Sequence, residues 1–310
     1  MLYLLLKVAS AVGMGLVLKR SDAHSLERLP LIRTNYAVAA IIGFFASVAL
    51  GQAHISGSAA LLAAVTGILF VAGLLIWARA IQAAGLALSV VAMRTAVVIP
   101  LLAAVFIWHE QPSMIEIAGS FVALLALALV LSDVASRQSP VGDETAARDA
   151  KNVPSSAIDI RQSSLGNRSS LVWLVLLFIV EGLVMVPALV FRKELPLNET
   201  MPFQTIIFVA AFGVTTLLYY MRRPRLVPET LKWGALLGTA NFGNYLFLVL
   251  ALTALPGLVV YPVIAAGELG LMAVAGVALW KEKVGIRSWL GITLAVLALV
   301  LIQLGKSAGA

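Results

Sequence analysis

Long apolar runs are the feature that most limits what this chain can fold into. Crossing a hydrocarbon layer of about 30 Å takes roughly 20 apolar residues at about 1.5 Å of helix rise each. Charged or turn residues separate ten such runs of 17 to 23 residues, which are Leu2–Leu18, Leu31–Leu50, Ala59–Ile81, Leu86–Trp108, Ile115–Leu131, Leu171–Phe191, Phe203–Tyr220, Trp233–Leu252, Leu258–Trp280 and Ile286–Leu304. The sequence therefore predicts an all-α integral membrane protein with about ten transmembrane helices, in the cell membrane.

Composition agrees with this class and excludes several others. Charged residues make up 12% of the 310-residue chain, 61% is hydrophobic and the mean hydropathy is +1.00, whereas a soluble domain carries about 25% charged residues. An ordinary soluble enzyme is excluded. The absence of cysteine excludes disulfides, thiolate metal sites and cysteine nucleophiles. The net charge of +7 is explained by membrane topology, so no nucleic-acid partner is expected.

A polar segment divides the chain into two halves of five runs each. Residues 132–170 are rich in Ser, Asp, Arg and Asn, and they are predicted to form a disordered linker. The expected organisation is a five-helix unit over 1–131, the linker, and a second five-helix unit over 171–310.

A shift of 172 residues aligns the two halves without a gap. It superposes Trp108 and Glu110 on Trp280 and Glu282, and it superposes Gly119 on Gly291. With an odd number of spans in each half, the second half enters the membrane from the opposite side. The sequence therefore predicts two inverted repeats related by a pseudo-two-fold axis in the membrane plane.

Short motifs at matching places in both halves resemble the drug/metabolite transporter superfamily, specifically its EamA-type ten-helix members. The motifs are an acidic turn after the fourth span of each half, a glycine in the next helix, and small residues leading into the fourth and ninth helices. They read Trp108-His109-Glu110-Gln111-Pro112 and Trp280-Lys281-Glu282-Lys283-Val284, Gly119 and Gly291, and Ala83-Ala84-Gly85-Leu86 and Leu255-Pro256-Gly257-Leu258. The resemblance implies a secondary carrier that works by alternating access around a central cavity, with both termini in the cytoplasm.

Loop charges favour the opposite orientation. Of the 22 lysine and arginine residues, seventeen fall in or beside the loops that follow odd-numbered runs, and three, Arg192, Lys193 and Lys306, fall on the other side. The positive-inside rule places the first set in the cytoplasm and both termini outside. The charge pattern and the resemblance thus leave two orientations open.

Four charged residues lie inside the predicted spans away from their ends: Lys7, Arg94, Glu181 and Glu268. Placing each charge in the centre of a membrane-spanning helix costs about 2.5–3.5 kcal/mol, so each residue needs a partner, a water-filled cavity or a functional role. The 172-residue shift places Arg94 close to Glu268, and Lys7 close to Glu181, in equivalent helices. We expect two pairs across the repeats, with Glu181 or Glu268 as a proton-coupling group and Arg94 holding an anionic group of the substrate. The alternative is a static Arg94–Glu268 pair, with Lys7 reaching to the membrane surface.

Further candidate binding residues are polar or aromatic. Asn241, Asn244 and Tyr245 share one helical face in the eighth run, where they could line a cavity or bond neighbouring helices. Tyr261 and Trp77 are two more candidates, although aromatic residues near span ends also serve as membrane anchors.

The sequence lacks the common motifs of enzymes and ATP-driven pumps, which leaves a transporter as the favoured function. The sequence holds no Walker A loop, no glycine-rich dinucleotide turn and no Gly-x-Ser-x-Gly elbow, and His109-Glu110 lacks the second histidine of a zinc helix. No enzyme activity, metal or cofactor is therefore expected. The sequence predicts secondary active transport of a small polar organic metabolite, with protons as a candidate coupling ion. The alternative is a carrier of amphipathic drug-like or lipid-linked molecules; a receptor or membrane enzyme is less well supported.

Overall fold

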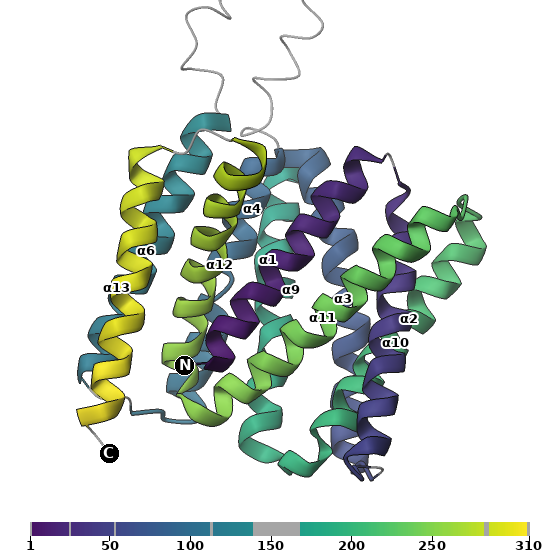
Figure 1. The fold of residues 1–310 in the computed structure, drawn as a ribbon, viewed down its shortest axis with the longest axis horizontal. Coiled ribbons are helices and arrows are strands. Elements are labelled where there is room, and N and C mark those ends of the chain that lie inside the picture. Colours follow the sequence, from purple (N-terminus) through teal and green to yellow (C-terminus); the bar gives the residue numbers. More distant parts are fainter. Residues whose placement is uncertain are drawn as a thin grey trace, which may run out of the picture.

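The structure is a computed structural model that describes residues 2–24, 26–52, 54–111, 114–138, 168–281 and 285–308. Throughout these ranges it is built from helices (Figure 1). The all-α prediction is confirmed, and all ten apolar runs form helical segments. The acidic residue of the second repeated turn, Glu282, lies outside the described residues, as does most of the predicted linker.

The described residues before 139 form six helices. They are α1 (Leu2–Ala23), α2 (Arg28–Ala49), α3 (Gly57–Ala84), α4 (Leu86–Thr95), α5 (Val98–Phe106) and α6 (Met114–Gln138).

The rest of the described chain continues from residue 168. It forms α9 (Arg168–Glu194), the 3₁₀ helix η3 (Leu197–Glu199), α10 (Thr200–Arg222), α11 (Pro228–Ala254), α12 (Gly257–Trp280) and α13 (Ile286–Ala308). Within the predicted linker of 132–170, α6 continues to Gln138 and α9 begins at Arg168.

Eight of these segments are long and apolar enough to cross a membrane, and α4 and α5 together form one of them over Leu88–Phe106. Shorter apolar stretches lie within α6 (Ile117–Val130) and α13 (Ile286–Ala298). Many large apolar side chains face outward, including Phe44, Phe45 and Phe121. Such a surface is unfavourable in water and suits a lipid environment.

The fourth span is broken in its middle. The helix stops at Thr95 and resumes at Val98, two residues before Pro100. Proline has no N–H to donate to the carbonyl of Ala96, and its ring clashes with that carbonyl. The Ile99 N–H bonds the Ala96 oxygen instead, at 3.0 Å. The prolines of the sixth and ninth spans act differently, because α9 and α12 continue through Pro187 and Pro262.

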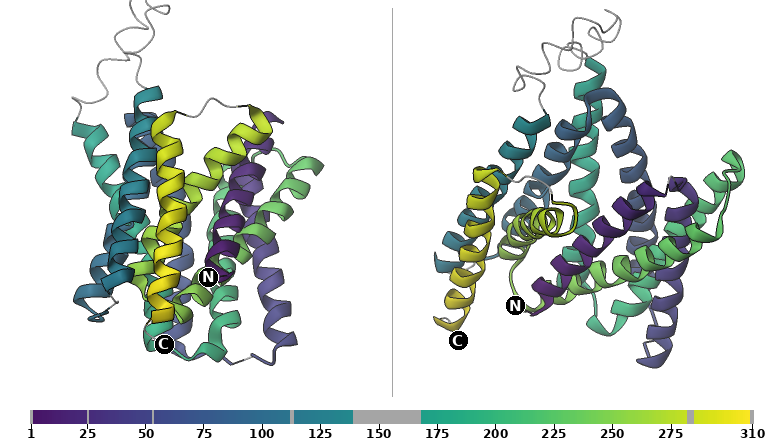
Figure 2. Two further views of the ribbon diagram at one scale, coloured as in Figure 1. Left: turned by 60° about the vertical axis from the view of Figure 1, so that its left-hand side comes forward. Right: turned by 45° about the horizontal axis from the view of Figure 1, so that its top comes forward.

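Helices from the two halves interleave. α1 and α2 pack on α11, α3 packs on α9 and α10, and α2 packs on α10. α6 and α13 lie side by side as a pair at one edge, where they also contact α12 (Figure 1 and Figure 2). The core between these helices is apolar and includes the stacked rings of Phe191 and Phe203, whose centroids are 4.3 Å apart.

Both chain ends lie on the same side of the bundle. In Figure 1 the N and C labels lie toward the lower face, whereas the end of α6 and the start of α9 lie at the upper face. α1 and α10, which carry basic residues in their last turns, also end at the upper face. These two basic helix ends therefore lie on the same side as the end of α6 and the start of α9.

Candidate functional site

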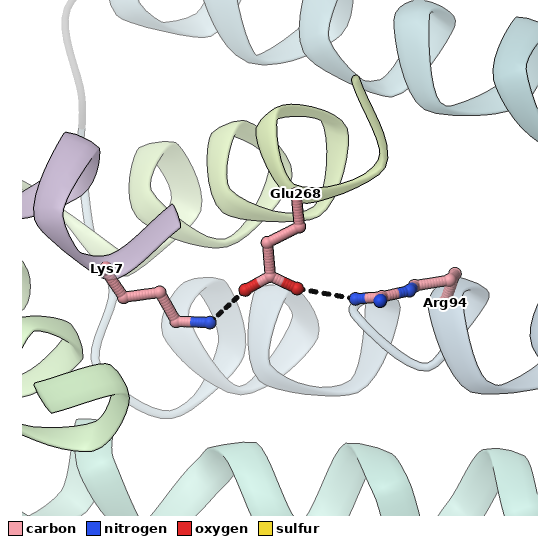
Figure 3. A network of polar contacts seen from close by, with 3 residues as sticks. All are labelled: Lys7, Arg94 and Glu268. Carbon is pink, nitrogen blue, oxygen red and sulfur yellow. Dashed lines mark hydrogen bonds and ion pairs between the residues drawn. The ribbon is translucent and has the colours of Figure 1, made fainter. Parts of the chain in front are cut away.

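Three charged side chains from three helices meet inside the bundle (Figure 3). Glu268 of α12 is buried and uses both carboxylate oxygens. Its Oε1 is paired with the Nζ of Lys7 in α1, and its Oε2 accepts a hydrogen bond from the Nη1 of Arg94 in α4 at 2.6 Å. One carboxylate therefore pairs with two cationic side chains. We call these three residues the charge cluster.

Local structure brings these side chains within reach of one another. α12 carries Gly267 beside Glu268, and a β-carbon at that glycine would lie 3.2 Å from Val8 of α1. The missing side chain lets α1 approach closely enough for Lys7 to bind Glu268. Arg94 lies one residue before the end of α4, at the break in the fourth span.

The charge cluster borders a small cavity of about 60 Å³. Apolar and aromatic side chains form the rest of its wall: Val97, Met185, Leu248, Tyr261, Ile264 and Ala265. The Nε of Arg94 is buried and has no hydrogen-bond partner among the described residues. A buried N–H without an acceptor is costly and needs an explanation, such as a ligand.

Of the two predicted pairs across the halves, one forms and one does not. Arg94 and Glu268 are paired as expected. Lys7 binds Glu268 and not Glu181, and it is buried, so it does not reach to the membrane surface. Within the described ranges no ion pair or side-chain hydrogen bond reaches Glu181.

Glu181 lies half-buried on α9, one helical turn before the cavity residue Met185. Its Oε1 occupies the space left by a glycine of α3, at 3.1 Å from where a β-carbon of Gly73 would lie. It interacts electrostatically with Arg94 and with Tyr36 of α2. The carboxyl group is thus close to the charge cluster but outside it.

The asparagines of α11 do not line this cavity. Asn241 is buried and donates from Nδ2 to the Oδ1 of Asn35 in α2 at 3.2 Å, which is the interhelical bond that the sequence left as an alternative. Asn244 Oδ1 and the hydroxyl of Tyr245 are buried, and no group in the described part of the chain bonds them. Tyr245 packs against the rings of Phe70 and Phe203.

The two remaining aromatic candidates differ in their surroundings. Tyr261 is buried, lines the cavity and donates its hydroxyl to the carbonyl oxygen of Met185 at 2.9 Å. It thereby joins α12 to α9. Trp77 is half-buried with its indole N–H unpartnered, and it is not among the cavity residues.

A second polar site joins the turn after α5 to α9 and the start of α12. The sequence did not predict this site. Glu110, in the acidic turn after α5, accepts the backbone N–H of Leu258 at 3.1 Å and pairs with Lys193 of α9 at 2.9 Å. Trp108 donates to Glu194 at 2.7 Å. A cavity of about 400 Å³ lies beside these contacts, between the turn and the segment Leu252–Pro256.

The turn that holds Glu110 has a signal in the sequence, because an acidic residue follows a tryptophan by two positions in both halves. His109 takes a left-handed backbone conformation with φ of 47°, and Lys281, its equivalent under the 172-residue shift, takes one with φ of 56°. In neither site, nor elsewhere in the described ranges, do three potential metal ligands cluster.

The fold and the buried charges define a multi-span helical membrane protein. The chain is 24% identical over 236 residues to an uncharacterized protein of Haemophilus influenzae, an alignment that covers 75% of this chain and 72% of that protein. No protein-family model matches the chain. A crystal structure of another protein has the same fold, with a TM-score of 0.71 and 13% identity over 97% of this chain and 98% of that one.

Proposed function

We propose that this protein is a secondary transporter that moves a small polar organic metabolite across the membrane by alternating access. The observation that carries the proposal is the charge cluster of Lys7, Arg94 and Glu268 beside a cavity in the centre of the helices. Ionisable groups at such a depth usually mark a pathway for substrates or ions. A receptor or scaffold has no need of them.

Contacts between helices support the predicted inverted repeat. The shift of 172 residues makes α1, α2, α3, α4–α5 and α6 equivalent to α9, α10, α11, α12 and α13. A two-fold exchange turns the α1–α11 contact into the α9–α3 contact, and the α2–α11 contact into the α10–α3 contact; all four are present. α1–α12 likewise has its counterpart in the packing of α9 on α4 and α5.

The repeated turn gives local support to the same proposal. The left-handed residues His109 and Lys281 are separated by 172 positions, and a positive φ is uncommon for residues other than glycine. Together with the sequence motifs, this favours membership of the drug/metabolite transporter superfamily and its EamA-type members.

Alternating access needs contacts that hold one end of the pathway closed and can separate. Glu110 joins the turn after α5 to α9 and α12 at one end of the molecule. The break between α4 and α5 lies between that turn and Arg94. A rotation at the break would separate Glu110 from Lys193 and open that end to the central cavity.

Reconstitution of the purified protein in liposomes tests the proposal. Uptake of amino acids, sugars and organic anions is measured with and without a pH gradient. We expect flux for at least one class, and a loss of tenfold or more in Glu268→Gln. Glu229→Gln serves as the matched control, because Glu229 is exposed at the start of α11. Absence of flux for every class, or full activity of Glu268→Gln, would contradict the proposal.

A second candidate is a carrier of amphipathic molecules, which the apolar wall of the cavity favours. In that case lipophilic dyes would cross the liposome membrane faster with the protein than without it, and Glu268→Gln would leave their flux unchanged. The excess of positive charge in the cluster argues against cationic amphiphiles.

A further inference from the structure

The charge cluster contains one more positive than negative group. Lys7 and Arg94 contribute two positive charges, and Glu268 contributes one negative charge. An uncompensated charge in a membrane interior is unfavourable. A further carboxyl group, that of Glu181 on α9, interacts electrostatically with Arg94. The cluster and an ionised Glu181 together are neutral.

We propose that the cavity binds one small organic carboxylate, and that Glu181 takes up one proton when this anion binds. The proposal rests on the transport function proposed above, since it names the substrate class and the coupling group of the same site. Before binding, the ionised Glu181 balances the cluster. After binding, the carboxylate of the substrate balances it, and a proton from water rests on a carboxyl oxygen of Glu181.

Arg94 supplies the group that recognises the carboxylate. Its Nη1 is used by Glu268, whereas its Nε is buried without an acceptor. A guanidinium N–H and a carboxylate form a short charge-assisted hydrogen bond. A ligand carboxylate on this edge of Arg94 would satisfy the unpartnered Nε and leave the bond to Glu268 intact.

The cavity also limits the rest of the ligand. Its free space of about 60 Å³ is several times the roughly 10–15 Å³ that one water molecule needs, so it has room for a small ligand. Val97, Leu248 and Ile264 surround that space. The expected ligand therefore joins one carboxylate to a short apolar body.

Glu268 is unsuited to be the proton acceptor, because both of its oxygens are held by cations. Glu181 has no such partner within the described ranges. Arg94 of α4 and Tyr36 of α2 interact electrostatically with Glu181, and Gly73 of α3 lies directly against its carboxylate. A ligand carboxylate bound to Arg94 weakens the attraction between Arg94 and an ionised Glu181. Glu181 then takes up a proton, which keeps the site neutral.

The test measures binding and proton uptake with three probes of the same length. Propionate, propionamide and propylammonium are titrated into the purified full-length protein in detergent near pH 7, where propionate is ionised. Calorimetry measures binding, and an indicator dye in weakly buffered solution measures proton uptake. We expect propionate to bind at least tenfold more tightly than the other two, with about one proton taken up per propionate bound.

Two variants separate the roles of the residues. Glu181→Gln is expected to retain propionate binding and to lose the proton uptake, whereas Glu229→Gln behaves like the native protein. If Glu181→Gln does not fold, the proton count of the native protein still decides. Equal binding of propionamide, no binding of propionate, no proton uptake, or uptake that persists in Glu181→Gln would each overturn the proposal.

Binding in detergent does not depend on flux, so the two proposals can fail separately. Propionate binding with proton uptake, but without transport of any solute class in liposomes, would support the ligand chemistry and overturn the carrier. Flux of uncharged solutes without propionate binding would support the carrier and overturn this inference.

Discussion

Glu268 is the residue on which the other two members of the charge cluster depend. It neutralises one cation and attracts the second, so its removal and the removal of Lys7 have different consequences. Without Lys7, the neutral Arg94–Glu268 pair remains, and a proton on Glu181 keeps the site without net charge. Without the charge of Glu268, two buried cations are left close together.

Glu268→Gln should therefore destabilise the protein much more than Lys7→Met. Removing one partner of a buried ion pair costs about 3–5 kcal/mol, because an uncompensated charge remains. We expect a loss of this size for Glu268→Gln and a loss of less than about half of it for Lys7→Met. Unfolding of the purified variants in detergent measures both, with Glu229→Gln as the control. A larger loss for Lys7→Met would contradict the charge assignment.

The sequence predicts the members of the cluster but only some of their partners. Rarity of charge in the apolar runs identifies the three members and Glu181, and the 172-residue shift predicts the Arg94–Glu268 pair. It assigns Lys7 to Glu181 wrongly, because equivalence between halves gives the depth of a residue but not which helices touch. Lys7 meets Glu268 since Gly267 brings α1 against α12, and a single sequence carries no direct sign of that contact.

At the scale of helices, glycine sets the closest approaches. A β-carbon at Gly67 of α3 would lie 2.2 Å from the backbone oxygen of Ile207 in α10, and 2.8 Å from the β-carbon of Ala210. At Gly213, also in α10, a β-carbon would meet no atom within 4 Å. The two positions thus form a matched pair for testing this interface.

Gly67→Ala should cost about 1–3 kcal/mol, as for other overpacked cores, because α3 and α10 must move apart. Gly213→Ala should be neutral or stabilise the protein by up to about 1 kcal/mol, since alanine favours a helix over glycine. Thermal unfolding in detergent compares the two. Equal effects would show that the close approach at Gly67 does not limit packing.

The start of α12 depends on a side chain from another element. Glu110 accepts the Leu258 N–H, one of the amide groups that a helix leaves unsatisfied in its first turn. Glu110→Ala removes both this bond and the ion pair with Lys193, whereas Lys193→Met removes only the ion pair.

Hydrogen exchange of the backbone around Leu258 should therefore be faster in Glu110→Ala than in the native protein. An unsatisfied amide costs about 1–3 kcal/mol, which corresponds to roughly a fivefold to hundredfold faster local opening. Lys193→Met should retain most of the protection. Equal exchange in the two variants would argue that Glu110 acts only through Lys193.

At the scale of the whole molecule, orientation is the main prediction. The chain contains no cysteine, so a single introduced cysteine reports its own side of the membrane. Gln82 lies exposed near the end of α3 on the basic face, and Asn198 lies exposed in η3 near the opposite face.

Gln82→Cys should resist, and Asn198→Cys should react with, a thiol reagent that does not cross the membrane when it is added to intact cells. This result follows from the positive-inside rule and would place both termini outside. The opposite labelling would support the orientation that the family resemblance implies. Labelling of both positions after permeabilisation is the control.

The number and limits of the helices were largely predictable from the sequence, because apolar runs of this length form few structures other than membrane-spanning helices. Two features of the helices were not predictable from the sequence. The fourth span is split at Ala96, although prolines in α9 and α12 leave those helices continuous. The polar residues 132–138 continue α6, because a helix that has left the apolar layer does not need apolar residues to extend.

The sharing of Glu268 between Lys7 and Arg94 also has a consequence for biosynthesis. Both cations belong to the first half of the chain, and their counterion is not made until residue 268. During synthesis the first half therefore enters the membrane with two charges that lack their final partner, each costing about 2.5–3.5 kcal/mol. A nascent chain that stops before α12 has only Glu181 to balance these two charges, so the ninth span completes the electrostatic balance of the helices made before it.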